Sequence, residues 1–517
     1  DIRWDQDNNI IPDIFYSSIA NLNPEIEKDE IKRLYDKISA SLCNEDLWKE
    51  FYELLTTWEI KLFDFINPEK NTYHVTTEYT CKNGEDEFRP DITLLMNGMP
   101  LVFIEVKKPN NKEWILAERK RIDTRFQNKK FIKFINITQV IVFSNNMEYD
   151  LDTLEQIEGA FYSSTSYDHA LFNTFKEDKQ VENIYALENL DEIDEETENF
   201  ILKDNNVTVI KHSPEFLTNK HPETPTNKIL TSLFNNRRFS TFLKYGLAYV
   251  KEHDWLQKHI MRYPQYFATK AIEKFIENGK KKGLIWHTQG SWKTALSFYN
   301  IKYLADYFQK KSIIPKFYFI VDRLDLLTQA KREFLSRWLV VHTVNSKDEL
   351  LKDFKSNKSF QNVQWKPEIT VVNIQKFKEN DHEEFLDTNL YNLNTQRVYF
   401  IDEAHRWYKL DGSFLVNLVE SDRDAIFIWL TGTPLIKWDS VSRKIFEWGY
   451  IHKYYYNSSI ADGYTLKLIR EEIETSYKMQ LNEIVKSIQI EKGNISMSEI
   501  FSHKKYVEPI LEYIVSD

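Results

Sequence analysis

The 517 residues, of which 42% are hydrophobic and 28% are charged, predict about three soluble globular domains at roughly 150 residues each. No apolar run approaches the ~18 residues of a membrane span, and the only cysteines, Cys43 and Cys81, exclude a disulfide scaffold or Cys-rich zinc site and indicate a reducing cytoplasm. The formal net charge of −11 argues against a protein that is basic all over, but not against one local basic groove for nucleic acid.

The first part of the chain reads as helices followed by strands. Apolar residues recur at helical spacing through 13–65. Two apolar runs, 91–96 and 101–107, then flank Asn97-Gly98, which is a strong hairpin signal. A basic, helix-like segment at 118–133 precedes another expected strand at 139–143.

The second part alternates strand and helix after a polar, acidic stretch that we interpret as a connector. Strands are expected at 283–288, 316–321, 369–374, 397–402 and 425–431, with helices at 294–309 and 323–336. Such alternation predicts a parallel sheet with helices on both faces.

A proline–aspartate pair and a Glu-x-Lys triplet bracket the hairpin. Asp91 follows Pro90, and Glu105 and Lys107 share one strand face, whereas Ile104 and Val106 are expected to point into the core. Two carboxylates can hold Mg²⁺, which activates water, and a lysine can stabilise developing charge. The pattern predicts a nuclease site with Asp91 and Glu105 as metal ligands. The competing interpretation is an ordinary Glu–Lys surface pair.

The hairpin register tests this interpretation. A two-residue Asn97-Gly98 loop alone pairs Asp91 with Ile104 and sends Glu105 to the other face. A three-residue loop, 97–99, pairs Asp91 with Glu105 directly. The nuclease interpretation therefore requires the longer loop, which we expect, or an equivalent bulge.

A second candidate site follows the strand at 283–288. Phosphate would be held by the backbone of Gly290 and Ser291, by Lys293 at the start of the next helix and, through Mg²⁺, by Thr294. Trp292 stands where glycine is usual, because the backbone must approach phosphate closely. A chance strand–loop–helix and a motor fold with impaired ATP binding are the two alternatives.

Acidic residues end the strand at 397–402, at the edge where open α/β sheets bind ligands. Asp402 would hold Mg²⁺ and Glu403 would orient the attacking water. Gln265 would read adenine, although an ordinary turn also explains it. The residues expected to couple hydrolysis to domain movement are His405, Thr431 and Thr433, with a simple Gly-Pro turn as the alternative for the last two.

These motifs, Pro90-Asp91 with Glu105-Val106-Lys107, 287–294, 402–405 and 431–434, together resemble the restriction (motor) subunit of type I restriction–modification enzymes. The resemblance covers most of 25–470. It implies ATP-dependent translocation of double-stranded DNA followed by cleavage of both strands. The implied cofactors are ATP and Mg²⁺, and the implied partners are methylation and specificity subunits in the cytoplasm.

The resemblance and the pattern together give an α/β fold with four segments. These are a PD-(D/E)xK nuclease-like domain at 1–165, an acidic connector at 166–245, a RecA-like parallel-sheet motor domain at 246–460 and a truncated start of a second motor domain at 461–517.

Three features depart from the family pattern. Trp292 replaces the loop glycine. The Gln-x-x-x-Tyr element is incomplete, because 118–127 holds only Gln127 and no tyrosine follows four residues later. No Gln-x-x-Gly-Arg-x-x-Arg of a second motor domain occurs, so we expect a fragment.

Two other functions stay open. One is a stand-alone repair helicase or translocase with a non-catalytic N-terminal module, which has no need for convergence of Asp91, Glu105 and Lys107. The other is a scaffold without turnover, which Trp292 favours. ATP binding by the isolated chain separates the enzymes from the scaffold.

Overall fold

The computed structural model describes residues 4–47, 49–56, 59–83, 85–107, 114–146, 159–166, 170–182, 193–252, 255–288, 290, 292–344, 349–350, 367–373, 394–402, 418–419, 422–432, 449–465, 475–492 and 497–516. The chain divides into two compact units, 1–465 and 466–517. Across the described ranges, no helix has both the length and the apolar character to span a bilayer.

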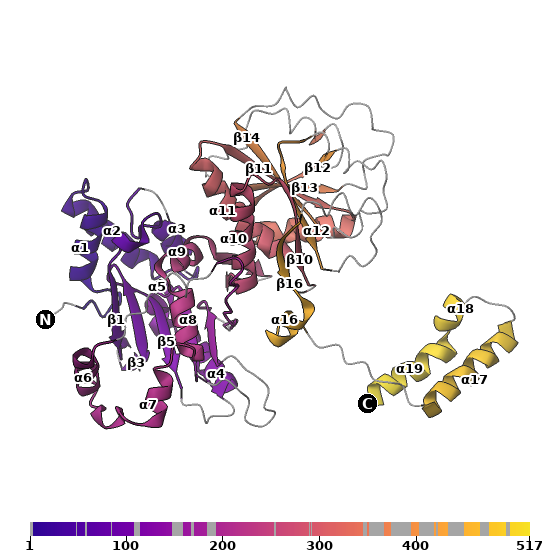
Figure 1. Cartoon of the computed structure of the whole chain (residues 1–517), viewed down its shortest axis with the longest axis horizontal. Helices are drawn as coiled ribbons and strands as arrows, with labels where there is room; N and C mark the ends of the chain where they lie inside the picture. Colours follow the sequence, from indigo (N-terminus) through magenta and orange to yellow (C-terminus); the bar gives the residue numbers. More distant parts are fainter. Residues whose placement is uncertain are drawn as a thin grey trace. The chain divides into compact units, whose positions relative to one another are not determined.

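Three helices open the first unit, as the apolar spacing predicted (Figure 1). Their bounds are α1 (Pro12–Leu22), α2 (Lys28–Ser41) and α3 (Lys49–Thr56). Leu34 and Ile38 are buried on one face of α2, whereas the charged residues between them are exposed. Each helix is stabilised because the apolar residues along one of its faces pack into the core.

A five-stranded mixed sheet follows, in the order β1-β4-β5-β6-β7. Its strands are β1 (Tyr73–Thr77), β4 (Ile92–Met96), β5 (Met99–Val106), β6 (Val140–Ser144) and β7 (Ala160–Ser163), beside a small hairpin of β2 (Cys81–Asn83) and β3 (Asp86–Phe88). Only β5 and β6 pair in parallel, so a crossover must join them. That crossover contains α4 (Trp114–Gln127), η2 (Lys129–Phe131) and α5 (Ile132–Ile137).

Residues 166–245, expected as an acidic connector, contain packed helices. Arg238 is 1% exposed, and its guanidinium bonds to Glu177 and Glu182. Part of the acidic charge is therefore neutralised inside the unit, which composition alone does not reveal. The helices of this stretch are α6 (Glu195–Asp204), η4 (Thr208–Ile210), α7 (Pro214–Asn219), α8 (Pro225–Leu233) and α9 (Asn236–Tyr245). A further short helix, η1 (Pro68–Lys70), lies before β1.

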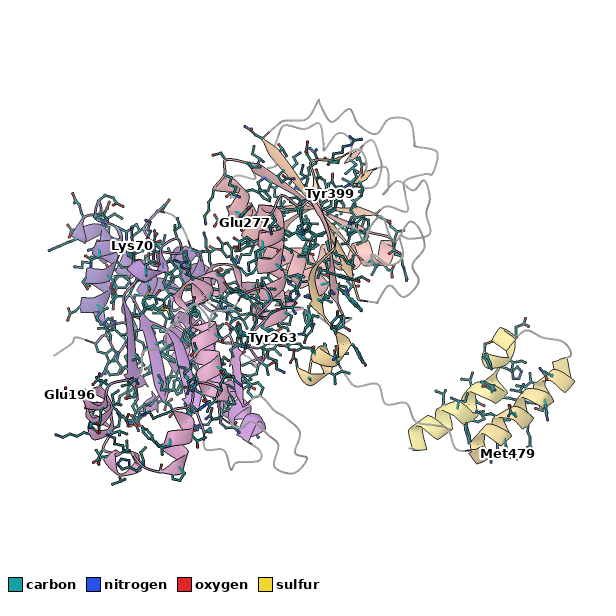
Figure 2. The ribbon with its side chains drawn as sticks, viewed as in Figure 1. Lys70, Glu196, Tyr263, Glu277, Tyr399 and Met479 are labelled. Atoms are coloured by element: carbon teal, nitrogen blue, oxygen red, sulfur yellow. The ribbon has the colours of Figure 1, made fainter. Side chains whose placement is uncertain are left out.

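The second sheet has seven strands, all parallel, in the order β12-β13-β11-β14-β15-β10-β16. The strands are β10 (Lys282–His287), β11 (Ile314–Val321), β12 (Val340–Val344), β13 (Glu368–Asn373), β14 (Thr395–Ile401), β15 (Ile426–Thr431) and β16 (Tyr450–Tyr454). The five predicted strands are confirmed, and the two edge strands, β12 and β16, were not predicted. Tyr399 lies in mid-sheet, stacked at 4.8 Å on both Tyr318 and Phe427 (Figure 2).

The helices described around this sheet are α10 (Tyr263–Glu277), α11 (Lys293–Gln309), α12 (Leu324–Ser336) and the short α16 (Tyr456–Ala461). The helix α11 contacts both α10 and α12, so these three lie side by side over the sheet. The helices predicted at 294–309 and 323–336 are confirmed as α11 and α12, whereas the general prediction of helices on both faces stays a prediction.

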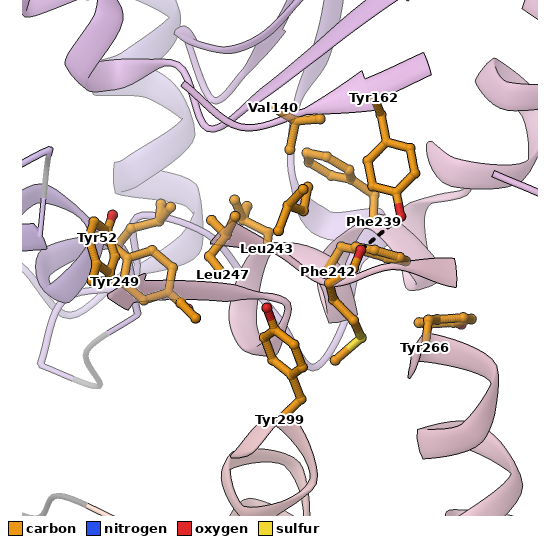
Figure 3. Packing of buried hydrophobic residues seen from close by; sticks show 14 of the residues in the cluster. Tyr52, Val140, Tyr162, Phe239, Phe242, Leu243, Leu247, Tyr249, Tyr266 and Tyr299 are labelled. Carbon is orange, nitrogen blue, oxygen red and sulfur yellow. Dashed lines mark hydrogen bonds between the residues drawn. The ribbon is translucent and has the colours of Figure 1, made fainter. Parts of the chain in front are cut away.

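The two sheets of the first unit share one hydrophobic core (Figure 3). The antiparallel pair β8 (Leu247–Glu252) and β9 (Trp255–Ile260) lies where they meet. The Tyr162 hydroxyl of β7 donates to the Met261 carbonyl at 2.8 Å. The Lys258 Nζ donates to Gln139 Oε1 at 2.7 Å. These hydrogen bonds thus fix the position of the first sheet relative to β8 and β9 inside a largely apolar interface.

The second unit consists, in its described residues, of three helices that contact one another: α17 (Thr475–Lys492), α18 (Met497–Phe501) and α19 (Lys504–Ser516). Leu481, Ile488 and Ile500 are buried in it. Its expected identity as the start of a second motor domain stays a prediction.

The buried Lys258 gives a pH-dependent prediction. Burial lowers the pKa of its ammonium well below 10.5, so above that lowered pKa and up to 10.5 the unfolded chain binds one more proton than the folded chain. Stability therefore rises with pH across this window, by at most about 1.4 kcal/mol per pH unit. We expect Lys258→Met to flatten the rise, as measured by urea unfolding at pH 7, 8 and 9.

The matched control is Lys251→Met, since Lys251 is an exposed lysine on the neighbouring strand β8. It should keep the parental pH dependence. Equal pH dependence in the Lys258→Met chain and the parent would contradict the assignment.

Candidate functional sites

The β4–β5 hairpin brings the first set of candidate residues together. Its turn has two residues, with Met96 opposite Met99, so the expected three-residue loop is wrong. A bulge between Leu94 and Leu95 shifts the register, leaving Leu101 as the extra residue and pairing Ile92 with Ile104. Continuing this register places Asp91 opposite Glu105. The bulge alternative is therefore confirmed.

The turn explains why the loop stays short. Asn97 and Gly98 have φ of 50° and 80°, the conformation of a type I′ turn. A Cβ on Gly98 would lie 2.7 Å from the Ile11 carbonyl oxygen and from the Phe15 nitrogen, so α1 leaves room only for glycine. The extra residue is consequently taken up inside the strand.

Asp91, Glu105 and Lys107 converge at the end of β5. Lys107 Nζ donates to Glu105 Oε1 at 2.8 Å and lies 3.8 Å from Asp91 Oδ2. The Val106 N–H donates to Asp91 Oδ2 at 2.8 Å. Glu105 is 2% exposed, whereas the Asp91 side chain is 44% exposed. One buried and one accessible carboxylate therefore share a lysine.

The prediction that Val106 points into the core is wrong. Ile104 is 1% exposed, but Val106 is 37% exposed. Val106 is the last residue of β5 and the only exposed one in that strand. Burial is continuous from Met99 to Glu105 and ends at Val106, so the alternation of buried and exposed residues expected at 104–107 does not occur.

Two arginines that the sequence analysis did not single out face the same carboxylate. Arg121 and Arg125 of α4 approach Glu105 Oε1 at 3.8 and 3.7 Å. The Arg125 guanidinium also lies 4.3 Å over the Phe88 ring. The available signal was their spacing of four residues in a basic helix. Their charge offsets the cost of burying Glu105.

The residues present fit a divalent cation. Glu105 Oε2 is buried without a hydrogen-bond partner, and carboxylate oxygens are the ligands that Mg²⁺ prefers. No cluster of three or more His, Cys, Asp or Glu occurs among the residues described, so the protein offers the two carboxylates Asp91 and Glu105. A bound cation would supply an activated water and positive charge for the phosphate.

The second set of candidates lies at the carboxyl edge of the parallel sheet. Lys293 and Thr294, both partly buried, begin α11 after β10, and Asp402 follows β14. The strands β10 and β14 flank β15, so they are about 10 Å apart at ~4.8 Å per strand. Thr431, 1% exposed, ends β15 between them. Ser291, Glu403, His405 and Thr433 lie outside the described residues.

Two described residues of the loop before α11 have the left-handed backbone that favours glycine, and one of them is a tryptophan. Gly290 has φ of 79° and Trp292 has φ of 57° and ψ of 54°, the left-handed region. The indole is 43% exposed, with its ring 6.0 Å from the His259 ring and 5.3 Å from the Arg262 guanidinium. The indole therefore lies near His259 and Arg262 with part of its surface exposed.

Gln265 is buried at the start of α10, and both polar atoms of its side-chain amide form hydrogen bonds with backbone groups. Its Oε1 accepts from the Arg262 N–H at 3.0 Å, and its Nε2 donates to the Trp292 carbonyl at 3.3 Å. The first bond closes the helix N-terminus. An adenine contact would require release of one of these bonds.

Two protein families match the chain. Residues 1–155 match the type I restriction enzyme R protein N terminus, and residues 264–499 match the SWI2/SNF2 ATPase. The first match contains Asp91, Glu105 and Lys107, and the second contains Lys293, Thr294 and Asp402.

The curated relatives are endonuclease subunits of type I restriction enzymes. The MjaVIIIP subunit of Methanocaldococcus jannaschii is 25% identical over 478 residues, covering 87% of this chain and 41% of the relative. The SsaAORF53P subunit of Staphylococcus saprophyticus is 25% identical over 457 residues, with the same two coverages of 87% and 41%. The chain thus spans about two-fifths of these relatives.

The chain also has weak similarity to solved structures. A fragment of an HsdR subunit of a type I restriction enzyme from Vibrio vulnificus has a TM-score of 0.29 and 13% identity, covering 92% of this chain and 75% of that one. The Pyrococcus furiosus Hef helicase domain has a TM-score of 0.28 and 18% identity, with coverages of 48% and 53%.

The expected resemblance is confirmed by the two family matches and the names of the relatives. The chain is α/β, with an N-terminal region that matches the N terminus of type I restriction enzyme R proteins and a parallel-sheet region that matches the SWI2/SNF2 ATPase.

Proposed function

We propose that this chain forms the nuclease and motor part of a type I restriction enzyme R subunit, which translocates double-stranded DNA with ATP and then cleaves both strands. The convergence of Asp91, Glu105 and Lys107 carries the proposal. In a protein with a non-catalytic N-terminal module, nothing would require a buried glutamate, an accessible aspartate and a shared lysine at one strand end. The repair-helicase alternative is therefore disfavoured.

In the nuclease site, Asp91 and Glu105 would hold Mg²⁺. Lys107 would then be released from bridging the two carboxylates and would face the phosphate, where it stabilises developing charge. Arg121 and Arg125 add positive charge on the side of α4. Such charge attracts a DNA backbone even though the chain carries a net charge of −11.

In the nucleotide site, we assign phosphate contacts to Lys293 and to the Gly290 and Ser291 backbone, and Mg²⁺ to Thr294 and Asp402. Glu403 would orient water and Gln265 would meet adenine. His405, Thr431 and Thr433 would couple hydrolysis to movement. Methylation and specificity subunits are the proposed partners, because the named relatives are subunits of type I restriction enzymes.

A scaffold without turnover is the second candidate, and one observation favours it. Trp292 places a large side chain at the left-handed residue that precedes the phosphate-binding lysine. Whether Trp292 prevents ATP binding therefore distinguishes the motor from the scaffold, and substitution of Trp292 tests it directly.

We predict that the chain with Trp292 binds ATP·Mg²⁺ feebly. Loss of two charge-assisted hydrogen bonds, at about 1.5–3 kcal/mol each, weakens binding by roughly two to four orders of magnitude. Trp292→Gly should recover that affinity and also remove a left-handed backbone cost of about 1–2 kcal/mol. Calorimetric titration of ATP·Mg²⁺ measures both chains.

The matched control is Trp338→Gly. Trp338 also has a left-handed backbone, with φ of 64°, but follows α12 at the opposite edge of the sheet. Its replacement should relieve similar strain and leave ATP affinity unchanged. Micromolar ATP binding by the chain that retains Trp292 would show that the loop tolerates the indole.

We further predict that Asp91→Ala or Lys107→Ala abolishes DNA cleavage while ATP hydrolysis persists, because the two chemistries use separate sites. The variants are made in a full-length R subunit with Trp292→Gly, assembled with its methylation and specificity subunits. Cleavage of DNA should fall by more than about 100-fold, the order expected for loss of one charge-stabilising group.

Asp86→Ala serves as the control for this pair. Asp86 is a carboxylate of β3 that pairs with Lys130 at 3.0 Å, outside the cluster. Cleavage should proceed with Asp86→Ala. If Asp91→Ala cleaved DNA at the parental rate, the nuclease assignment would fail.

A further inference from the structure

Six of the large apolar side chains that are exposed to solvent lie in one short stretch, 193–217. Their exposed fractions range from 37% to 90%, and they are Ile193, Phe200, Ile201, Val209, Ile210 and Leu217. Among the described side chains of 193–221, only Leu202 is buried. The stretch lies outside both family matches, 1–155 and 264–499, and contains no residue assigned to either candidate site.

Polar contacts, rather than an apolar core, hold the helices of this stretch together. Lys211, which follows η4, donates from Nζ to Glu195 Oε1 at 2.9 Å and to Asn199 Oδ1 at 2.7 Å. Lys220, which follows α7, donates from Nζ to Glu198 Oε2 at 2.6 Å. Glu195, Glu198 and Asn199 therefore mark the face of α6 that is turned toward η4 and α7.

The opposite face of α6 is both apolar and acidic. Glu196, Phe200 and Asp204 are four residues apart, so they form one row along the helix, and all three are exposed. Ile201, 46% exposed, lies beside this row, and Val209 of η4, which contacts α6, is 90% exposed. We call these five residues the α6 outer face. Figure 1 shows α6 at the periphery of the first sheet, away from the seven-stranded sheet.

The charge around the α6 outer face selects the kind of partner that can cover its apolar side chains. Residues 193–220 contain six Asp or Glu and three Lys, a net charge of −3 with histidine neutral. Such a surface repels DNA and anionic membranes. A second copy of the chain in a two-fold contact would bring the same acidic row against itself. A helix with apolar residues on one face and lysine or arginine beside them complements both properties.

We propose that the α6 outer face docks a basic amphipathic helix of a partner subunit of the restriction complex. Phe200 and Val209 are the apolar anchors, and Glu196 and Asp204 pair with lysine or arginine of that helix at the rim of the contact. Docking there uses no residue of the two candidate sites. The inference rests on the proposed function, because the proposed function supplies the partner subunits.

A helical peptide tests the chemistry of the α6 outer face. The probe is a labelled peptide of leucine and lysine, about 18 residues long with leucine at helical spacing, and its counterpart carries glutamate in place of lysine. Fluorescence anisotropy with the whole chain should show binding of the lysine peptide only. Phe200→Gln and Val209→Gln should each weaken this binding by about tenfold or more, because each removes an apolar anchor without adding charge. Glu196→Gln should weaken it less and reduce its salt dependence.

The matched controls lie elsewhere in the same unit. Val75 is 68% exposed in β1, and Glu277 is exposed at the end of α10. Val75→Gln and Glu277→Gln should leave peptide binding unchanged. All the substituted residues are exposed, so every variant should keep the parental circular dichroism and unfolding transition. Equal affinity of the lysine peptide for the parent, Phe200→Gln and Val209→Gln chains would overturn the proposal, as would tight binding of the glutamate peptide.

The second test uses the purified complex of methylation and specificity subunits and a full-length R subunit. Phe200→Gln and Val209→Gln together should weaken binding of the R subunit to this complex by at least about tenfold, whereas Val75→Gln should not. Parental affinity in the double variant would overturn the docking face and leave the proposed function intact. Failure of the parental R subunit to bind the complex would instead overturn the partnership in the proposed function, and this proposal with it.

Discussion

One extra residue in strand β5 determines whether the N-terminal module can hold a metal. The bulge between Leu94 and Leu95 moves the pairing by one position, and a strand that slips by one residue turns every side chain to the other face. Without it, Asp91 would face Ile104, and Glu105 would be alone in the core. The close approach of α1 to Gly98 keeps the turn at two residues and places the shift in the strand.

The same unit joins the metal-binding candidate to the nucleotide-binding candidate through packed structure rather than a flexible linker. Tyr162, Gln139 and the segment 170–182 bond across the shared core of the two sheets. Movement at the phosphate loop therefore has a physical route toward the nuclease sheet. Long-range coupling of this kind requires an element with two arrangements, and the loop that carries Trp292 is the candidate for that element.

Sequence patterns predicted the parallel sheet because buried parallel strands are continuous apolar runs, and they located Asp402 at a strand end and Lys293 at the start of a helix. They missed the edge strands β12 and β16, whose partly exposed, polar-interrupted sequences lack such runs. They also missed Arg121 and Arg125, because which face of α4 meets Glu105 depends on tertiary packing. The packed helices of 166–245 were not predicted, because charged residues are usually exposed and the composition does not show that ion pairs such as Arg238 with Glu177 are buried.

The central claim is that Asp91 and Glu105 form one divalent-metal site, and calorimetric titration of Mn²⁺ into the nucleotide-free chain tests it most directly. The account predicts one bound ion per chain, lost with Glu105→Gln or Asp91→Asn and retained with Asp402→Asn, whose carboxylate belongs to the other site. Binding that survives Glu105→Gln, or that disappears only with Asp402→Asn, would contradict the account.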